Sequence, residues 1–334
     1  MRSDVKTWIG AGVTAPVRLL AQMADVPLRQ WQRLAGRGGM IGFFLLPNML
    51  IFGVFVLVPL GINFAYSVTG GTAVFLPDRS YVGGANFDRL LDCTNHFDPN
   101  SCRDDVFWIA VWNTVRFVGL QVTAMTICAM ITALILNSKI RARAFWRAVF
   151  FFPVLLSPVV VGLIWRWILQ RQGLLNYLLY QFDAEQVNWL TERGWAFTAA
   201  VGVSVWAHVG FYALILLAGL QAIPRDLYEA AEMDGTKPAR AFWRITLPLL
   251  WPNLLVVIVL SLIRAVQVFD EVYVLTGGGP GTSTLYLTQY IYEVGFASTL
   301  RNSGVASAAS LLMGGVLVVL TLLQLGLTRW RDRK

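Results

Sequence analysis

The sequence predicts an all-α integral membrane protein with six transmembrane helices and both termini in the cytoplasm. Of its 334 residues 56% are hydrophobic and 14% charged, whereas soluble domains contain about 25% charged residues. Six apolar runs are long enough to cross a bilayer core about 30 Å thick. Basic residues gather in alternate connections between these runs, as cytoplasmic segments do under the positive-inside rule.

The six runs alternate with polar connections that set their orientation. They cover residues 40–66, 108–136, 148–169, 196–220, 248–272 and 304–328. The connections on the side of the amino terminus hold 18 of the 27 Lys and Arg residues, and the opposite connections hold six. Only Arg116, Arg166 and Arg264 fall within runs. The net charge of +8 therefore indicates contact with anionic lipid rather than nucleic acid.

This pattern also predicts the organisation of the chain. It comprises a cytoplasmic or interfacial segment at 1–39, a first helix with an extracytoplasmic loop at 40–107, a core at 108–328 that includes an inner loop at 221–247, and a cytoplasmic tail at 329–334. Residues 16–35 fit an interfacial helix, and a disordered tail fits equally well. No cleavable signal peptide is expected in the first segment.

The cysteines provide a second indication of sidedness. Cys93 and Cys102 share the polar loop CTNHFDPNSC, whereas Cys128 lies in an apolar run. The loop at 67–107 is assigned to the exterior by the charge pattern, and an oxidising exterior permits disulfides. We expect Cys93 and Cys102 to pair, with two free thiols as the alternative.

Proline is frequent inside the apolar runs. The positions are Pro47, Pro59, Pro153, Pro158, Pro248 and Pro252. Kinked helices are tolerated in membranes where neighbouring helices or a water-lined cavity satisfy the freed backbone groups. The prolines therefore favour a transporter over a passive anchor.

The inner loop between the fourth and fifth runs reads IPRDLYEAAEMDGTKPARAFWRITLPLLWP. Pro224 and Asp226 are typical of a helix start, and Gly235 of the left-handed residue that closes a helix. A short helix is therefore expected over about 225–234. A helix of fewer than three turns is marginal alone in water, so a second helix, beginning near Pro238, and a docked partner must brace it.

The composition of the short helix indicates that it binds another protein. Leu227, Ala230, Ala231 and Asp234 fall on one side at helical spacing. The two alanines leave no bulk that would hold a partner away, and Glu229 supplies negative charge beside them.

The stretch EAAEMDG, followed by FWRITLPLLWP, resembles the EAA loop of inner-membrane permeases of binding-protein-dependent ABC importers. The resemblance implies a type I importer permease fold in the bacterial inner membrane. It also implies that a coupling helix enters a cleft of a separate ATPase subunit, and it assigns this role to Glu229, Ala230, Ala231, Asp234 and Gly235. The sequence departs from the family at Thr236, where alanine is common.

Other stretches narrow the resemblance to the carbohydrate-uptake branch, the maltose and glycerol-3-phosphate type. They are NTVRF at 113–117, LAGLQAIPRDLYEAA, and VFDEVYVLTGGGPGTSTLYLTQYIYEVGFAS at 268–298. The resemblance implies import of a sugar or polyol delivered by an extracytoplasmic binding protein. The implied partners are a second homologous permease and two ATPase subunits, which hold ATP and Mg while this chain holds no cofactor.

The sequence offers no catalytic or metal-binding constellation, so an enzyme is not expected. Its histidines are His96 and His208, and it lacks HExxH, CxxC and GxSxG motifs. The run GGGPG is followed by no Gly-Lys-Ser/Thr, which a phosphate-binding loop requires. It is better explained as a tight exterior turn.

Candidate substrate contacts lie in the fourth and fifth runs. Arg264 has Ser261 and Gln267 three residues to either side, which places all three on one helical face. An arginine at the centre of a bilayer costs about 2.5–3.5 kcal/mol unless it faces water or a partner, and pairing across a subunit interface is the alternative. The resemblance to maltose-type permeases points to His208, Phe211, Ser261 and Arg264. His208 as a simple interhelical hydrogen bonder remains open.

An ion-gradient-driven carrier or channel is the alternative function. Such proteins commonly show membrane-embedded carboxylates or an inverted repeat. The runs hold few acids, and Asp270 and Glu271 are expected near the outer boundary. The ABC importer permease is therefore the favoured interpretation.

Overall fold

The computed structural model describes residues 36, 38, 41–298 and 301–332 of the chain. The segment at 1–39, with its candidate interfacial helix, lies outside this part except for residues 36 and 38. The contacts within the chain define two units, Met1–Asn63 and Phe64–Lys334, which are described separately.

The described residues are mainly helical. In chain order the helical elements are η1 (Gly53–Leu57), α2 (Val58–Ser67), η2 (Leu76–Asp78), α3 (Ala85–Leu91), η3 (Pro99–Ser101), α4 (Asp105–Asn137), α5 (Arg143–Phe151), η4 (Phe152–Leu155), α6 (Pro158–Leu169), α7 (Leu174–Gln181), α8 (Arg193–Ala222), α9 (Asp226–Met233), α10 (Pro238–Ala241), η5 (Phe242–Thr246), α11 (Leu247–Val266), α12 (Asp270–Thr276), α13 (Leu287–Tyr292), η6 (Glu293–Ala297) and α14 (Ser303–Asp332). Strands β1 (Thr69–Gly70) and β2 (Ser80–Tyr81) pair antiparallel, with Thr69 opposite Tyr81.

The first unit contains most of the first predicted span. The helix runs from Ile41 to Ser67, with the π-helical turn η1 in its middle. Pro59 explains the turn, because it has no N–H to donate and its ring displaces the carbonyl four residues earlier. The N–H of Val58 bonds instead to the carbonyl of Gly53.

Within the described residues, five helices are long and apolar enough to cross a membrane. They are Ile41–Ser67, Asp105–Asn137, Arg193–Ala222, Pro238–Val266 and Ser303–Gln324. A bent pair of helices, Arg143–Leu155 and Pro158–Gln181, makes a sixth span if it is counted as one. The predicted all-α membrane fold is confirmed.

The third predicted span, 148–169, is wrong as a single helix. The chain bends by 99° between η4 and α6. Pro153 and Pro158 both lack the N–H that would continue a helix, and a residue before proline is driven from helical to extended backbone. Ser157 is extended accordingly, with ψ 136°.

The fifth predicted span, 248–272, continues too far. Helix α11 ends at Val266, and α12 begins at Asp270 in a new direction. The turn lets α12 pack on α6, where Val272 and Leu275 are buried. Burial of this apolar face explains the break, which a continuous run of apolar residues cannot reveal.

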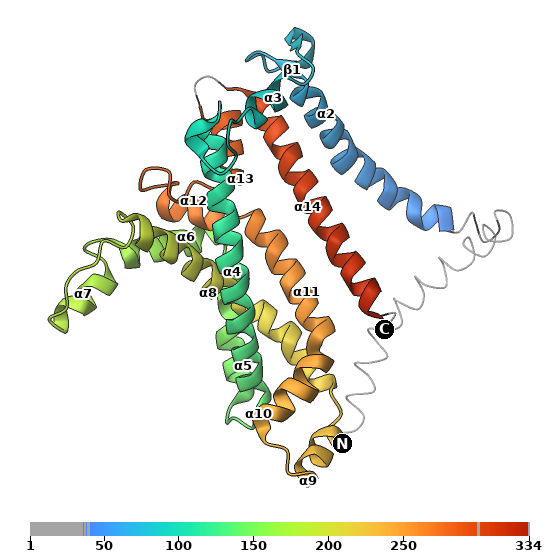
Figure 1. Cartoon of the computed structure of the whole chain (residues 1–334), viewed down its shortest axis with the longest axis vertical. Coiled ribbons are helices and arrows are strands. Elements are labelled where there is room, and N and C mark those ends of the chain that lie inside the picture. The colour runs from blue at the N-terminus through green and yellow to red at the C-terminus, as the bar shows by residue number, and fades with distance from the viewer. Residues whose placement is uncertain (1–35, 37, 39–40, 299–300, 333–334) are drawn as a thin grey trace, which may run out of the picture. The chain divides into compact units, whose positions relative to one another are not determined.

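The second unit is held by three apolar clusters along its long helices. In Figure 1, α4, α8 and α11 lie side by side, and the contacts between all three pairs agree. One cluster joins the second half of α4, the second half of α8 and the first half of α11. A second joins α4, α6, α8 and α12. The third joins α3, the start of α4, α13 and α14.

A disulfide, an ion pair and hydrogen bonds stabilise the loop before α4. Cys93 and Cys102 are bonded in a disulfide. Asp104 caps α4, since its Oδ1 accepts from the N–H of Phe107 at 3.1 Å, and it pairs with Arg89 at 3.5 Å. Arg79 donates to the Oγ of Ser303 at 2.9 Å and so joins this loop to the start of α14.

Candidate functional site

Helix α9 occupies Asp226–Met233 and forms the short helix expected over about 225–234. It closes with two backbone hydrogen bonds, from Gly235 N to Glu232 O and from Thr236 N to Ala231 O, each 2.9 Å long. This is a Schellman motif, which requires a left-handed residue after the helix. Gly235 supplies it with φ +67°.

The outer surface of α9 is exposed in the described part of the chain. Met233 is 88% exposed and Leu227 43% exposed. Glu229, Ala230 and Asp234 are exposed as well, and Ala231 is half-buried. A small helix that presents apolar and acidic side chains together is suited to fit into a complementary groove on another protein.

The inner side of α9 is fixed to the membrane-spanning helix. The hydroxyl of Tyr228 lies 2.8 Å from the Oγ1 of Thr246, and its ring packs on the cluster that joins α4, α8 and α11. Thr246 is buried at the end of η5. The π-helical turn η5 arises because Pro248 cannot donate, so the N–H of Leu247 bonds to the carbonyl of Phe242.

The candidate substrate residues lie on two neighbouring helices. His208 Nδ1 is 2.9 Å from the carbonyl oxygen of Ser204, and His208 is within electrostatic range of Arg264. Phe211 and Arg264 are exposed in this chain. The structure thus brings His208, Phe211 and Arg264 to one region of α8 and α11.

The two other candidates differ in exposure. Ser261 is fully buried, and its hydroxyl donates to the carbonyl of Ile258 in the same helix at 3.1 Å. Gln267 is the C-cap residue of α11, and its N–H bonds to the carbonyl of Ile263 at 3.3 Å. Like Arg264, Gln267 is exposed.

Glu271 is a residue of this region that sequence reasoning missed. It was expected near the outer boundary, yet it is 4% exposed. The hydroxyl of Ser204 donates to its Oε1 at 3.4 Å, and it lies within electrostatic range of His208. In the sequence, Glu271 stands out only as one of two adjacent acids after the fifth apolar run. Its burial depends on the break after α11, which the sequence did not reveal.

The two other motifs behind the family resemblance contact each other. Asn113, in NTVRF, donates through Nδ2 to the carbonyls of Thr282 and Leu285 at 2.7 and 3.2 Å. The hydroxyl of Thr114 accepts from the N–H of Leu287 at 2.9 Å. The start of α4 therefore holds the segment after the glycine-rich run in place.

The glycine-rich run forms the tight turn that the sequence predicts. Gly277, Gly278 and Gly281 have φ of +61°, +88° and +62°. The φ of +88° at Gly278 strains any other residue, and a Cβ there would also lie 2.6 Å from Nε2 of Gln289. The peptide bond between Gly279 and Pro280 is cis.

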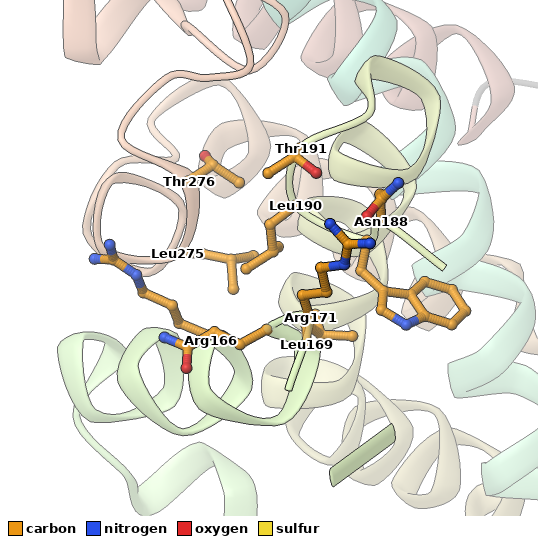
Figure 2. A pocket seen from close by; sticks show the side chains of 10 residues that line it. Arg166, Leu169, Arg171, Asn188, Leu190, Thr191, Leu275 and Thr276 are labelled. Atoms are coloured by element: carbon orange, nitrogen blue, oxygen red, sulfur yellow. The ribbon is translucent and has the colours of Figure 1, made fainter. Parts of the chain in front are cut away.

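A cavity of about 350 Å³ lies beside this turn, between α6, α12 and the segment before α8. Figure 2 shows Arg166, Arg171, Asn188 and Thr276 around it. Arg166 donates to the carbonyl of Val274 at 3.4 Å. The guanidinium group of Arg166 therefore has a backbone oxygen as its partner.

A bundle of helices that are long and apolar enough to cross a membrane defines a class, the multi-pass membrane proteins. A profile of the family "binding-protein-dependent transport system inner membrane component" matches residues 125–334. The chain belongs to this family.

Individual relatives match almost the whole chain. It is 35% identical to the trehalose/maltose transport system permease protein MalF of Thermococcus litoralis, over 90% of this chain and 97% of that protein. It is 32% identical to the sulfoquinovosyl glycerol transport system permease protein SmoG of Agrobacterium fabrum, over 95% of this chain and 100% of that protein.

Solved structures share the fold. A permease chain of a bacterial ABC transporter that imports the acidic polysaccharide alginate matches with a TM-score of 0.74 and 23% identity, over 90% of this chain and 98% of that one. A second alginate transporter structure, in complex with a periplasmic protein that holds an alginate pentasaccharide, matches with a TM-score of 0.71. The type I importer permease fold is confirmed.

Family membership establishes the general role of the chain. It is a multi-pass inner-membrane component of an importer that depends on a binding protein, and it is a transport component rather than an enzyme. The ion-gradient-driven carrier or channel is set aside on the same ground.

Proposed function

We propose that this chain is one permease half of an ATP-driven importer, in which α9 docks into an ATPase subunit and transmits its movement to the membrane helices. One observation carries the proposal: α9 is exposed on its outer side and hydrogen-bonded to the start of the fifth span on its inner side, between Tyr228 and Thr246. A movement imposed on α9 would reach α11 through this contact and through the apolar cluster beneath it.

The cargo is proposed to be a sugar or a related polyol. Two relatives are named as permease proteins of transport systems for trehalose or maltose and for sulfoquinovosyl glycerol, and these compounds are glycosides. His208, Phe211 and Arg264 would provide an aromatic face and hydrogen-bonding groups toward such a cargo. Ser261 and Gln267 remain candidates on the same two helices, Ser261 only if its side chain is released from its present bond.

The complex is proposed to contain four further subunits. A second permease would cover Phe211 and Arg264, which are exposed in this chain. Two ATPase subunits would bind ATP and Mg, and an extracytoplasmic binding protein would deliver the cargo, as the periplasmic protein of the alginate transporter structure suggests. The loop with Cys93 and Cys102 would face the exterior, and α9 the cytoplasm.

The test is ATP hydrolysis and uptake by the purified complex in proteoliposomes. Glu229→Arg reverses the charge on the exposed side of α9, and we expect it to abolish hydrolysis stimulated by the binding protein while the complex keeps its fold. Glu185→Arg, an exposed acid far from α9 in sequence, is the matched control and should leave stimulation unchanged. Undiminished transport by the Glu229 variant, or uptake by this chain without any ATPase subunit, would contradict the proposal.

A further inference from the structure

A second cavity, of about 560 Å³, lies between the first half of α4, the start of α8 and the segment after the glycine-rich turn. Its lining includes Asn113, Arg116, Arg193, Phe197 and Ser283. A smaller cavity of about 290 Å³ shares Asn113 and Arg116 with it. We call these two adjoining cavities together the outer basic cavity, and their lining includes none of the candidate substrate residues of α8 and α11.

Two arginines give this cavity a positive charge that no described residue neutralises. The side chains of Arg116 and Arg193 have no hydrogen bond and no ion pair within the described part of the chain. No Asp or Glu is among the described residues that line the two cavities. Nη2 of Arg193 lies 3.7 Å from where a Cβ on Gly281 would stand, so its guanidinium group lies against the glycine-rich turn.

The floor of the cavity adds a polar group without a partner. The Oγ of Ser283 is buried and has no hydrogen bond. A buried hydroxyl without a partner costs free energy until a ligand or water satisfies it. Asn113 fixes this floor, because its Nδ2 donates to the carbonyl of Thr282 at 2.7 Å.

The wall on the other side is aromatic. The rings of Phe97 and Trp112 lie 5.5 Å apart with an interplanar angle of 31°. Trp112 is fixed by a hydrogen bond from its Nε1 to the carbonyl of His96 at 2.9 Å, and the disulfide closes the loop that carries Phe97. Phe97 is 80% exposed, so an aromatic face is free beside the arginines.

We propose that the outer basic cavity is an entry subsite for a saccharide that carries a carboxylate or another anionic group. Guanidinium groups hold carboxylates by paired, charge-assisted hydrogen bonds, and exposed aromatic rings suit the apolar face of a sugar. The larger cavity falls within the range of about 300–1,000 Å³ that is usual for small-molecule sites. This inference rests on the proposed function and specifies its substrate class as acidic.

The test measures how tightly two trisaccharide probes bind to the whole complex in nanodiscs. One probe, trigalacturonate, is acidic, and the other, maltotriose, is neutral. We expect trigalacturonate to bind at least about tenfold more tightly, because a charge-assisted hydrogen bond is worth about 1.5–3 kcal/mol. The double variant Arg116→Gln, Arg193→Gln should remove that preference. Arg171→Gln, which removes one charge from the cavity of Figure 2, is the control and should keep it.

Further variants keep the test decisive if the double variant does not fold. Arg116→Lys retains the charge without the paired geometry and should weaken trigalacturonate binding severalfold, and Ser283→Ala should do the same. Equal binding of the two probes, or an unchanged preference in the double variant, would overturn the proposal.

Two other readouts separate this proposal from a docking role of the arginines and from the proposed function itself. If the double variant weakens association with the sugar-free binding protein as much as it weakens trigalacturonate binding, the arginines are docking contacts and the subsite is wrong. Uptake in proteoliposomes distinguishes failure of the subsite from failure of the proposed function. ATP-driven uptake without any effect of the arginines contradicts only the subsite, whereas failure of all ATP-driven uptake contradicts the proposed function.

Discussion

The hydroxyl of Tyr228 and the Oγ1 of Thr246 lie 2.8 Å apart and join α9 to the base of α11. The two residues are 18 positions apart, on either side of the Schellman turn at Gly235. The contact makes the exposed helix and the membrane-spanning helix one mechanical unit. It also explains how a helix of eight residues, too short to be stable alone, is held in its position.

Tyr228→Phe and Thr246→Val each remove one partner of this bond. We expect each to reduce the coupling of ATP hydrolysis to uptake, with an energetic effect of about 0.5–1.5 kcal/mol. The double variant should cost no more than the more severe single variant, since the pair acts as one interaction. Additive losses in a double-mutant cycle, measured by stimulated ATP hydrolysis, would show that the two hydroxyls act separately.

Substitutions at Gly235 test the backbone conformation of the turn without a change in packing. A Cβ at this position meets no atom within 4 Å, so only its φ of +67° opposes a side chain. Gly235→Val should destabilise the end of α9 by about 1–2 kcal/mol and lower stimulated ATP hydrolysis. Gly235→Asn should retain most activity because asparagine tolerates this conformation. Equal losses in both variants would contradict the conformational explanation.

Thr114 is expected to stabilise the segment after the glycine-rich turn. Thr114→Val leaves the buried N–H of Leu287 without its acceptor, which costs about 1–3 kcal/mol. Hydrogen exchange at residues 282–287 should accelerate and the melting temperature should fall. Thr123→Val is the control, because the Thr123 hydroxyl bonds only to its own helix at Gly119, and it should change stability by less than about 0.5 kcal/mol.

Gly210 marks the closest approach of α8 to the bent third span. A Cβ on Gly210 would lie 2.0 Å from the carbonyl oxygen of Phe150. Gly210→Ala should therefore displace α5 and destabilise the protein by about 1–3 kcal/mol, seen as a lower melting temperature in detergent. Gly202→Ala, in the same helix with open space around it, should be neutral or stabilising. The same loss in both variants would contradict the close approach.

Four of the six predicted spans agree with the structure, and the fifth agrees as far as Val266, because long apolar runs are the direct signature of helices that cross a membrane. The third could not be predicted in detail, since Pro153 and Pro158 signal a break but not its angle of 99°. The end of α11 at Val266 depends on the packing of α12 against α6, which no run of residues encodes locally.

Helix α9 was more predictable than the candidate substrate region. Pro224, the alanines and Gly235 are local signals, and they predict α9 almost to the residue. The burial of Glu271 and the contact of Asn113 with Thr282 join parts of the chain that are far apart in sequence. Such contacts depend on the tertiary arrangement, so the sequence alone could not place them.

The most direct test of the central claim is a crosslink from α9. Met233→Cys, in a Cys128→Ser background that removes the free cysteine, places a thiol at the most exposed apolar position of the helix. In membranes that contain the full complex, we predict a crosslink from Cys at position 233 to an ATPase subunit, with a yield that changes when ATP is bound. A thiol at this position that reacts with a membrane-impermeant reagent from outside the cell, or that crosslinks to no ATPase subunit, would contradict the account.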